Sequence, residues 1–325
     1  MRAPSAFLRS LSLRRRSPEA VAPLPVKTQF DHQLTAELDS LRPQGTNESK
    51  FASATGLVQL LDASLNTQKI ALELFVNSPY REDTDRRALD EYLEDNTDVL
   101  DTCNYLVEKI EVVYKFVDSM RVVARMVDSG AKPESMARNK RVLDHLESSC
   151  QAMERECKEM SKRGSCLRRM LKQKLAHETE LSEIICGSKA MALVVCKFLE
   201  LSLSFDSKHR LPTILQSHPM SSSWVGLLQD LEKQVVKEAS EKKSTTKSGP
   251  SLMMVELQQT MAATRDLQEQ IKGKREKELK SCVDRLKRSC RKLEDGLVAI
   301  EGKVKDLYKN LINIRMALLG VVSQQ

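Results

Sequence analysis

The chain has 325 residues, of which 30% are charged and only 4% are aromatic, and its 52 basic and 45 acidic residues give a net charge of +7. This composition favours helices, because a β-rich fold of this length would need more aromatic residues and turns. Six of the basic residues and a single acid lie in residues 1–27, so the rest of the chain is nearly balanced and a general nucleic-acid-binding surface is not implied.

Residues 1–27 form a basic arm that we expect to be disordered. Five arginines and four serines precede Glu19, with apolar residues between them, and three prolines keep the end of the arm extended. A basic, serine-containing and acid-poor segment is typical of an organellar transit peptide. A basic arm without a targeting role and a weak anchor on anionic lipid fit the same composition.

Four helices are predicted in the first half of the remaining chain. Thr28 can cap a short helix that ends at Pro43, and longer helices are expected over 52–77 and 84–128. The helix over 84–128 has three apolar columns, which suits a bundle core better than a two-stranded coiled coil. After a turn at 130–133, a further helix continues to about residue 171, and Gly164 interrupts its apolar rhythm, so we expect a kink or a closely approaching neighbour there.

The stretch 191–205 is dense in apolar residues and indicates a buried helix. Membrane insertion is the alternative, but charged residues interrupt or bound the stretch, which is shorter than the roughly 20 apolar residues that a span requires. Trp224 opens another amphipathic helix and is expected to be buried at the end of the bundle. Residues 237–251 are polar and should form a flexible loop.

The last helix is predicted to run from about 252 to 322, and its apolar residues repeat in an alternating four-three rhythm. At about 1.5 Å per residue, the part that carries this rhythm spans roughly 60 Å and needs partners along its whole length. We therefore predict an all-α fold, an elongated bundle of long antiparallel helices with coiled-coil-like packing, in which 28–325 is a single domain. The apolar positions, named the seam below, are Leu279, Val283, Leu286, Cys290, Leu293, Leu297, Ile300, Val304, Leu307, Leu311, Ile314, Leu318 and Val321.

No catalytic, cofactor-binding or metal-binding residue is predicted. The sequence contains no phosphate-binding loop, no dinucleotide fingerprint and no H-E-x-x-H, and its single H-x-x-E pair, His177 with Glu180, lies in a highly charged segment and indicates a surface position. Eight cysteines contain no C-x-x-C pair, and several fall on apolar stripes, so we interpret them as small buried residues in a reducing compartment. An enzyme is not expected.

Several short motifs, in this order along the chain, resemble the plant BYPASS family and its relatives. Members of that family are plant-specific helical proteins without known catalytic residues, associated with root, shoot and leaf development and with restraint of a mobile root-derived signal; some are described as chloroplast-targeted or membrane-associated. The motifs are Phe30-Asp31-His32-Gln33-Leu34, Leu61-Asp62-Ala63-Ser64-Leu65, Leu100-Asp101-Thr102-Cys103-Asn104, Val117-Asp118-Ser119-Met120-Arg121, Leu293-Glu294-Asp295-Gly296-Leu297, Val304-Lys305-Asp306-Leu307-Tyr308 and Arg315-Met316-Ala317-Leu318-Leu319.

The resemblance implies a regulatory or scaffold protein of developmental signalling that binds protein partners through helical surfaces, without nucleic acid and without a cofactor. The exposed side of the last helix and residues 237–251 are candidate contact regions. Two alternatives stay open: a peripheral membrane or vesicle-trafficking adaptor that uses the basic arm and 190–205, and a homo-oligomer formed through the seam. The expected location is the chloroplast if residues 1–27 act as a transit peptide, or otherwise the cytoplasm or a membrane periphery.

Overall fold

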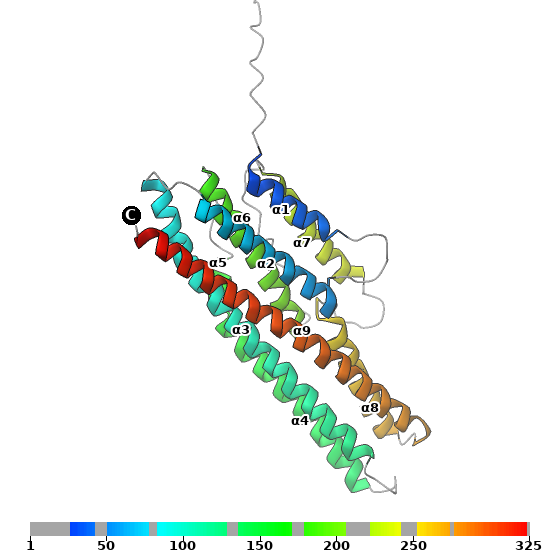
Figure 1. The fold of residues 1–325 in the computed structure, drawn as a ribbon. Coiled ribbons are helices and arrows are strands. Elements are labelled where there is room, and N and C mark those ends of the chain that lie inside the picture. Colours follow the sequence, from blue (N-terminus) through cyan, green and yellow to red (C-terminus); the bar gives the residue numbers. More distant parts are fainter. Residues whose placement is uncertain are drawn as a thin grey trace, which may run out of the picture.

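The computed structural model describes residues 27–42, 51–77, 83–128, 136–170, 179–205, 222–241, 252–273 and 276–323, and within these ranges it contains helices and no strand (Figure 1). The predicted all-α fold is confirmed. Apart from Lys27, the basic arm lies outside the described residues. The helices are α1 (Gln29–Ser40), α2 (Ala54–Asn77), α3 (Asp83–Asp128), α4 (Met136–Arg163), α5 (Ser165–Met170), α6 (Glu180–Ser202), α7 (Ser223–Glu241), α8 (Val255–Gly273) and α9 (Glu276–Ser323).

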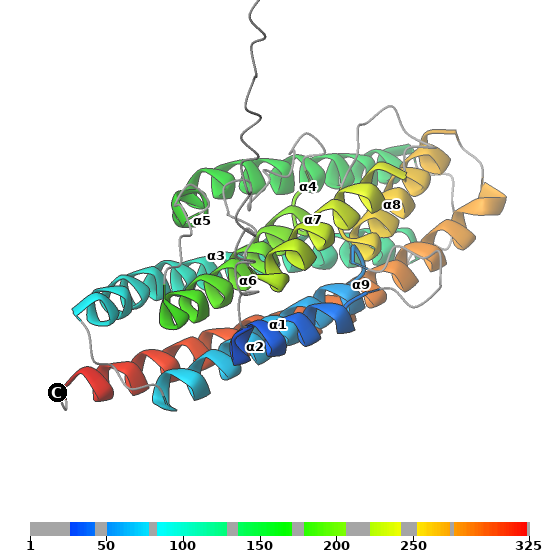
Figure 2. The ribbon, with the colours of Figure 1, turned by 90° about the horizontal axis from the view of Figure 1, so that it is seen from above.

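The two longest helices, α3 and α9, pack against each other in opposite directions along the molecule (Figures 1 and 2). Near the start of α3, Arg315 of α9 donates a hydrogen bond to the carbonyl oxygen of Leu93. At the other end of α3, Asp128 forms an ion pair with Lys287. Residue numbers therefore rise along one helix as they fall along the other, which is the antiparallel arrangement that the sequence predicts.

Two further pairs of neighbours, α2 with α9 and α3 with α6, run parallel. In both pairs the contacting residue numbers rise together, so these neighbours are not joined as simple hairpins. The contacts that establish the direction are Ala54 with Gly296 and Asp62 with Lys303 in the first pair, and Asp95 with Lys189 and Tyr105 with Glu200 in the second.

The molecule consists of two four-helix arrangements that share α3 and α9. In one half, α2 and α6 complete the bundle and α1 and α7 cover them; in the other half, α8 and α4 take their places (Figure 2). The change occurs where α8 begins, because the Met254 amide donates to the Ser202 carbonyl at 2.9 Å and the Val255 amide donates to the Ala52 carbonyl at 2.9 Å. The start of α8 is thereby tied to the end of α6 and to the segment that precedes α2.

The seam of α9 faces the interior, as predicted. From Val283 to Leu318 every seam residue is at most 2% exposed, whereas Leu279 is half-buried and the side chain of Val321 lies outside the described part. Since α2, α3 and α8 of the same chain cover these residues, the seam is not available on the surface of the molecule. The charged face opposite the seam is the solvated one.

The prediction of one continuous helix over 252–322 is wrong. Instead, α8 ends at Gly273 and α9 begins at Glu276, and the two helices fold back on each other, with Arg285 paired to Asp266 at 2.5 Å. The reason is visible in the sequence, because residues 272–278 contain no apolar side chain and glycine favours a helix end. The apolar pattern is interrupted there, and a hairpin buries the apolar side of α8 against α9.

The remaining elements largely follow the sequence. The rhythm over 143–171 breaks at Gly164, which separates α4 from α5, and an added Cβ there would lie 3.2 Å from the Tyr105 ring. Trp224 is fully buried, as predicted. Helix α7 extends to Glu241, so residues 237–241 are helical rather than part of the expected loop, and 242–251 lie outside the described residues.

Helix α6, which contains most of the apolar stretch 191–205, is buried almost completely by other helices of the chain. Its neighbours are α1, α2, α3, α5 and α7, so its apolar side chains already have protein partners. Within the described ranges, no helix has both the length and the hydropathy needed to cross a bilayer.

Candidate functional site

The motif at the start of α1 joins three helices. Asp31 is 3% exposed, and its Oδ1 accepts hydrogen bonds from the backbone amides of Ser223, at 2.7 Å, and Trp224, at 3.3 Å, so it caps the N-terminus of α7. The ring of Phe30 lies on Gly187 of α6, where an added Cβ would be only 2.4 Å from Cε1. These side chains therefore hold helices together and are not directed into a cleft.

Replacing Asp31 with alanine is expected to lower the free energy of unfolding by about 1 to 2 kcal/mol, because two backbone amides at the start of α7 lose their acceptor. Asp31→Asn keeps a side chain of the same length with an acceptor oxygen. It should therefore retain most of the stability that Asp31→Ala loses. Urea unfolding followed by circular dichroism measures both variants. Equal losses for alanine and asparagine would show that the cap is not the reason for the effect.

Two other motifs meet through an ion pair between α3 and α9. Arg121 Nη1 donates to Glu294 Oε1 at 2.8 Å, and its second terminal nitrogen binds the other carboxylate oxygen. This two-pronged contact lowers the pKa of Glu294 and raises that of Arg121. Both side chains are about one-third exposed, at 32% and 34%, so water screens the attraction.

A double-mutant cycle with Arg121→Met and Glu294→Gln should give a coupling energy of about 0.5 to 1 kcal/mol near neutral pH. Since the folded state lowers the pKa of Glu294, the coupling is present above the ordinary pKa of glutamate and is lost as the pH falls through the lowered value. Measuring the four proteins by urea unfolding at neutral and acidic pH tests this sign. A coupling that grows on acidification would contradict it.

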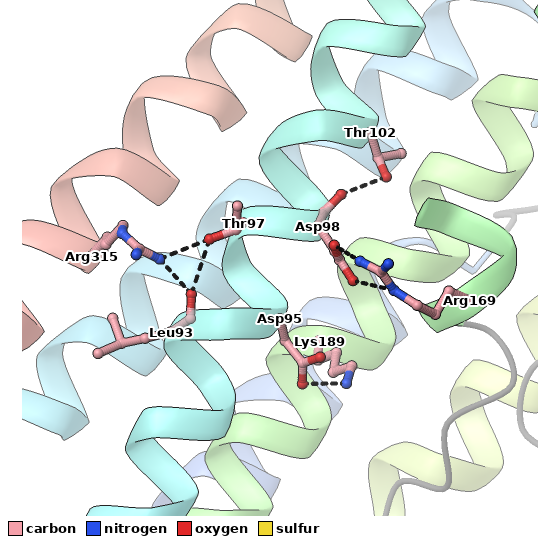
Figure 3. A network of polar contacts seen from close by, with 8 residues as sticks. All are labelled: Leu93, Asp95, Thr97, Asp98, Thr102, Arg169, Lys189 and Arg315. Atoms are coloured by element: carbon pink, nitrogen blue, oxygen red, sulfur yellow. Dashed lines mark hydrogen bonds and ion pairs between the residues drawn. The ribbon is translucent and has the colours of Figure 1, made fainter. Parts of the chain in front are cut away.

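Charged side chains also connect α3 to α5, α6 and α9 (Figure 3). Lys189 of α6 pairs with Asp95, and Arg169 of α5 binds both oxygens of Asp98, with Nε 3.1 Å from Oδ2. Each of these carboxylates has a cation in contact. The arrangement fixes the position of the neighbouring helices and does not bring a general base next to a nucleophile.

Lys109 is the most deeply buried charged side chain in the described residues, at 1% exposure. Its Nζ donates to the Glu200 carbonyl oxygen at 2.8 Å and to Ser204 Oγ at 2.7 Å, and it lies 5.7 Å from the centre of the Tyr105 ring. Burial lowers the pKa of Lys109 to about 8, against the opposing attraction of the Glu200 carboxylate. All around it are protein groups, so a dissolved substrate has no access to the amine.

Of the seven cysteines whose side chains the structure describes, six are buried and Cys150 is half-buried. Burial raises the pKa of Cys157 to about 11 and that of Cys186 to about 12, and a hydrogen bond to Cys196 together with burial raises the pKa of Cys103. A thiol that resists ionisation is a poor nucleophile. None of the described cysteines forms a disulfide bond; they are Cys103, Cys150, Cys157, Cys186, Cys196, Cys282 and Cys290.

The histidine-based candidates give no site in the described part of the chain. His177 lies outside the described residues, and its sequence partner Glu180 is exposed at the start of α6. In the described ranges no cluster of three His, Cys, Asp or Glu side chains could hold a metal ion. An open groove of about 390 Å³ lies between α3 and α4, but Phe116 and Met153 on its floor are already buried by their neighbours.

One side of α9, named the outer face below, is uncovered by any described element over most of the helix. Added Cβ atoms at Gly302 and Gly320 would meet nothing within 4 Å, and Val298 and Met316 are 59% and 65% exposed. The sequence indicated this side as a candidate contact region, and the structure places it on the surface. Its residues are Arg288, Arg291, Lys292, Asp295, Val298, Ala299, Gly302, Lys305, Asp306, Lys309, Asn313, Met316, Leu319 and Gly320.

Residues 189–322 match the family model described as Protein ROH1-like. The matched region runs from within α6 to the end of α9, so it includes the outer face of α9 and the motifs between Leu293 and Leu319. The motifs of α1, α2 and α3 lie outside it. No curated protein and no solved structure matches the chain.

Proposed function

We propose that this chain is a non-enzymatic helical scaffold of plants that regulates developmental, root-to-shoot signalling by binding other proteins. Two findings support a place among the BYPASS family and its relatives: the order of the motifs from Phe30 to Leu319, and the match of residues 189–322 to the ROH1-like family. The polar side chains of Asp31, Arg121 and Glu294 contact other helices of the same chain. This use of motif residues supports an architectural role for the motifs.

The outer face of α9 is the observation that carries the proposal. This 48-residue helix packs against α3 along its length and against α8 and then α2 in its successive halves, so it is held in place while its outer face meets solvent. A long helix held in this way offers its exposed side chains in fixed positions to a partner helix. Recognition would then need no rearrangement of the bundle.

Proximity labelling in plant root tissue tests the proposal. We expect the full chain fused to a biotin ligase to label a reproducible set of proteins, with purified members of the set binding the purified chain directly. The ligase alone is the control. A labelled set identical to that of the control, or a turnover assay showing activity that depends on His177, would contradict the proposed function.

A peripheral membrane or trafficking adaptor is the second candidate, favoured by the six basic residues and single acid of residues 1–27. Fractionation of the full chain and of a form lacking these residues separates the two uses of the arm. If the arm is an anchor, its removal abolishes binding to anionic liposomes. If it is a transit peptide, its removal abolishes import into an organelle and leaves liposome binding unchanged.

A further inference from the structure

Where residues 121–128 of α3 lie along residues 287–294 of α9, the cations fall into two groups. Those of the first group contact an acidic side chain of another helix: Arg121 pairs with Glu294, and Lys287 pairs with Asp128. These contacts neutralise charge at the helix boundary and fix the register of the two helices. A partner could bind a cation of this group only by breaking an existing ion pair.

The second group, named the basic cluster here, consists of Arg125, Arg288, Arg291 and Lys292. All four are exposed, and among the described residues no acidic side chain forms an ion pair with any of them. Arg125 lies between Arg121 and Asp128 on α3, whose partners on α9 are Glu294 and Lys287, and this register places it across from Arg291. The cluster thus brings cations of two helices together, and the nearest exposed carboxylates of α9, Asp284 and Asp295, form no ion pair with them in the described part of the chain.

Two exposed apolar side chains flank the basic cluster. Val122 is 41% exposed and precedes Arg125 by one helical turn, and Val298 is 59% exposed and follows Arg291 by two turns on α9. Guanidinium groups bind carboxylates through two parallel hydrogen bonds. We propose that the basic cluster, with Val122 and Val298, binds an acidic amphipathic helix of a partner protein; this inference rests on the proposed function and names the chemistry of its partner.

Charge and side-chain type favour this occupant over two others. A second copy related by a two-fold axis through this surface would bring one basic cluster against another, where like charges repel. A membrane surface is usually held by lysines together with large apolar or aromatic side chains, whereas three of these four cations are arginines and the exposed apolar neighbours are valines. An acidic helix satisfies both the guanidinium groups and the valines.

Fluorescence anisotropy with two synthetic helical peptides tests the proposal on the full chain. Both peptides carry leucine at the a and d positions of three heptads; one has glutamate at the flanking positions, and the other has lysine there. We expect the glutamate peptide to bind, and the variant with Arg125→Glu, Arg288→Glu, Arg291→Glu and Lys292→Glu to bind it at least about tenfold more weakly. The lysine peptide should not bind the unmodified chain.

A matched variant separates this surface from net charge. Lys140→Glu, Arg141→Glu, Arg155→Glu and Lys158→Glu change four exposed cations of α4, alter the net charge equally and should leave binding of the glutamate peptide unchanged. Circular dichroism establishes that both variants fold. Equal losses in the two variants, no preference for the glutamate peptide, or binding of the cluster to phosphatidylserine vesicles but not to the peptide would overturn the proposal.

The proposed function and the proposed partner chemistry can fail separately. If the unmodified chain captures partners and the variant of the basic cluster captures all of the same partners, the inference about the cluster is wrong and the scaffold function stands. If the unmodified chain labels and binds no partner, the scaffold function itself is wrong. Sedimentation velocity of the unmodified chain completes the test, because self-association that the cluster variant abolishes would assign the surface to a second copy.

Discussion

Replacing Gly296 of α9 with alanine is expected to lower the free energy of unfolding by about 2 to 3 kcal/mol, the upper part of the range for an overpacked core. An added Cβ at this position would lie 2.6 Å from the Cβ of Ala54, which is the first residue of α2. A Cβ cannot turn away from the contact as the end of a long side chain can, so α2 and α9 would have to move apart.

Exchanging the two residues tests this explanation directly. The double variant Ala54→Gly and Gly296→Ala restores one methyl group and one hydrogen at the contact, so it should recover more than half of the lost stability. Gly302→Ala is the matched control on the same helix: its added Cβ meets nothing within 4 Å, and helix propensity predicts a gain of up to about 1 kcal/mol. Urea unfolding of the four proteins provides the measurement, and a loss at Gly302 equal to that at Gly296 would contradict the packing argument.

Local periodicity explains why burial could be predicted from the sequence. The seam of α9 and the apolar columns of α3 lie inside because a repeat of three and four residues fixes one side of a helix regardless of what covers it. Asn96 shows the limit of this reasoning, since a polar residue in an apolar column fits both a register contact and a solvated edge. The structure buries it at 2% exposure, with its Nδ2 3.4 Å from the Leu311 carbonyl oxygen.

Contacts between distant parts of the chain could not be predicted in the same way. Asp31 caps a helix that begins 192 residues later. The local sequence pattern of neither segment indicates that the two are in contact. The parallel packing of α3 and α6 likewise depends on how the whole chain is connected. For the candidate site, the sequence identified the exposed side of α9, but the basic cluster required the register of α3 against α9, which places Arg125 beside Arg291.

The buried charge of Lys109 is expected to make stability depend on pH in the alkaline range. Its pKa is about 8 in the folded chain, compared with 10.5 for an unperturbed lysine, because burial disfavours the ammonium form. Between these two values the unfolded chain binds a proton that the folded chain does not. The free energy of unfolding contributed by this group therefore rises as the pH rises through that range.

Lys109→Met removes the titrating group while keeping the apolar stem, so the comparison isolates this effect. The difference in unfolding free energy between the unmodified chain and Lys109→Met should shift by about 2 to 3 kcal/mol in favour of the unmodified chain between about pH 7 and about pH 10. Near neutral pH the methionine variant should be as stable as the unmodified chain or more so, since a buried ammonium group carries a desolvation cost that methionine lacks.

Lys115→Met is the control, because Lys115 lies on the same helix but is exposed, in a surface ion pair with Glu156, and so lacks the burial of Lys109. Buried thiols such as Cys157 lower stability as the pH rises, since the unfolded chain ionises them first, but they are present in all three proteins and largely cancel in the comparison. The unfolding free energies of Lys109→Met and Lys115→Met, each taken relative to the unmodified chain, could instead change with pH in the same way. That result would mean that the Lys109 amine keeps its proton in the folded bundle. The hydrogen bonds from Lys109 to the Glu200 carbonyl and to Ser204 would then outweigh burial, and the contact between α3 and α6 would be held by a permanent charge.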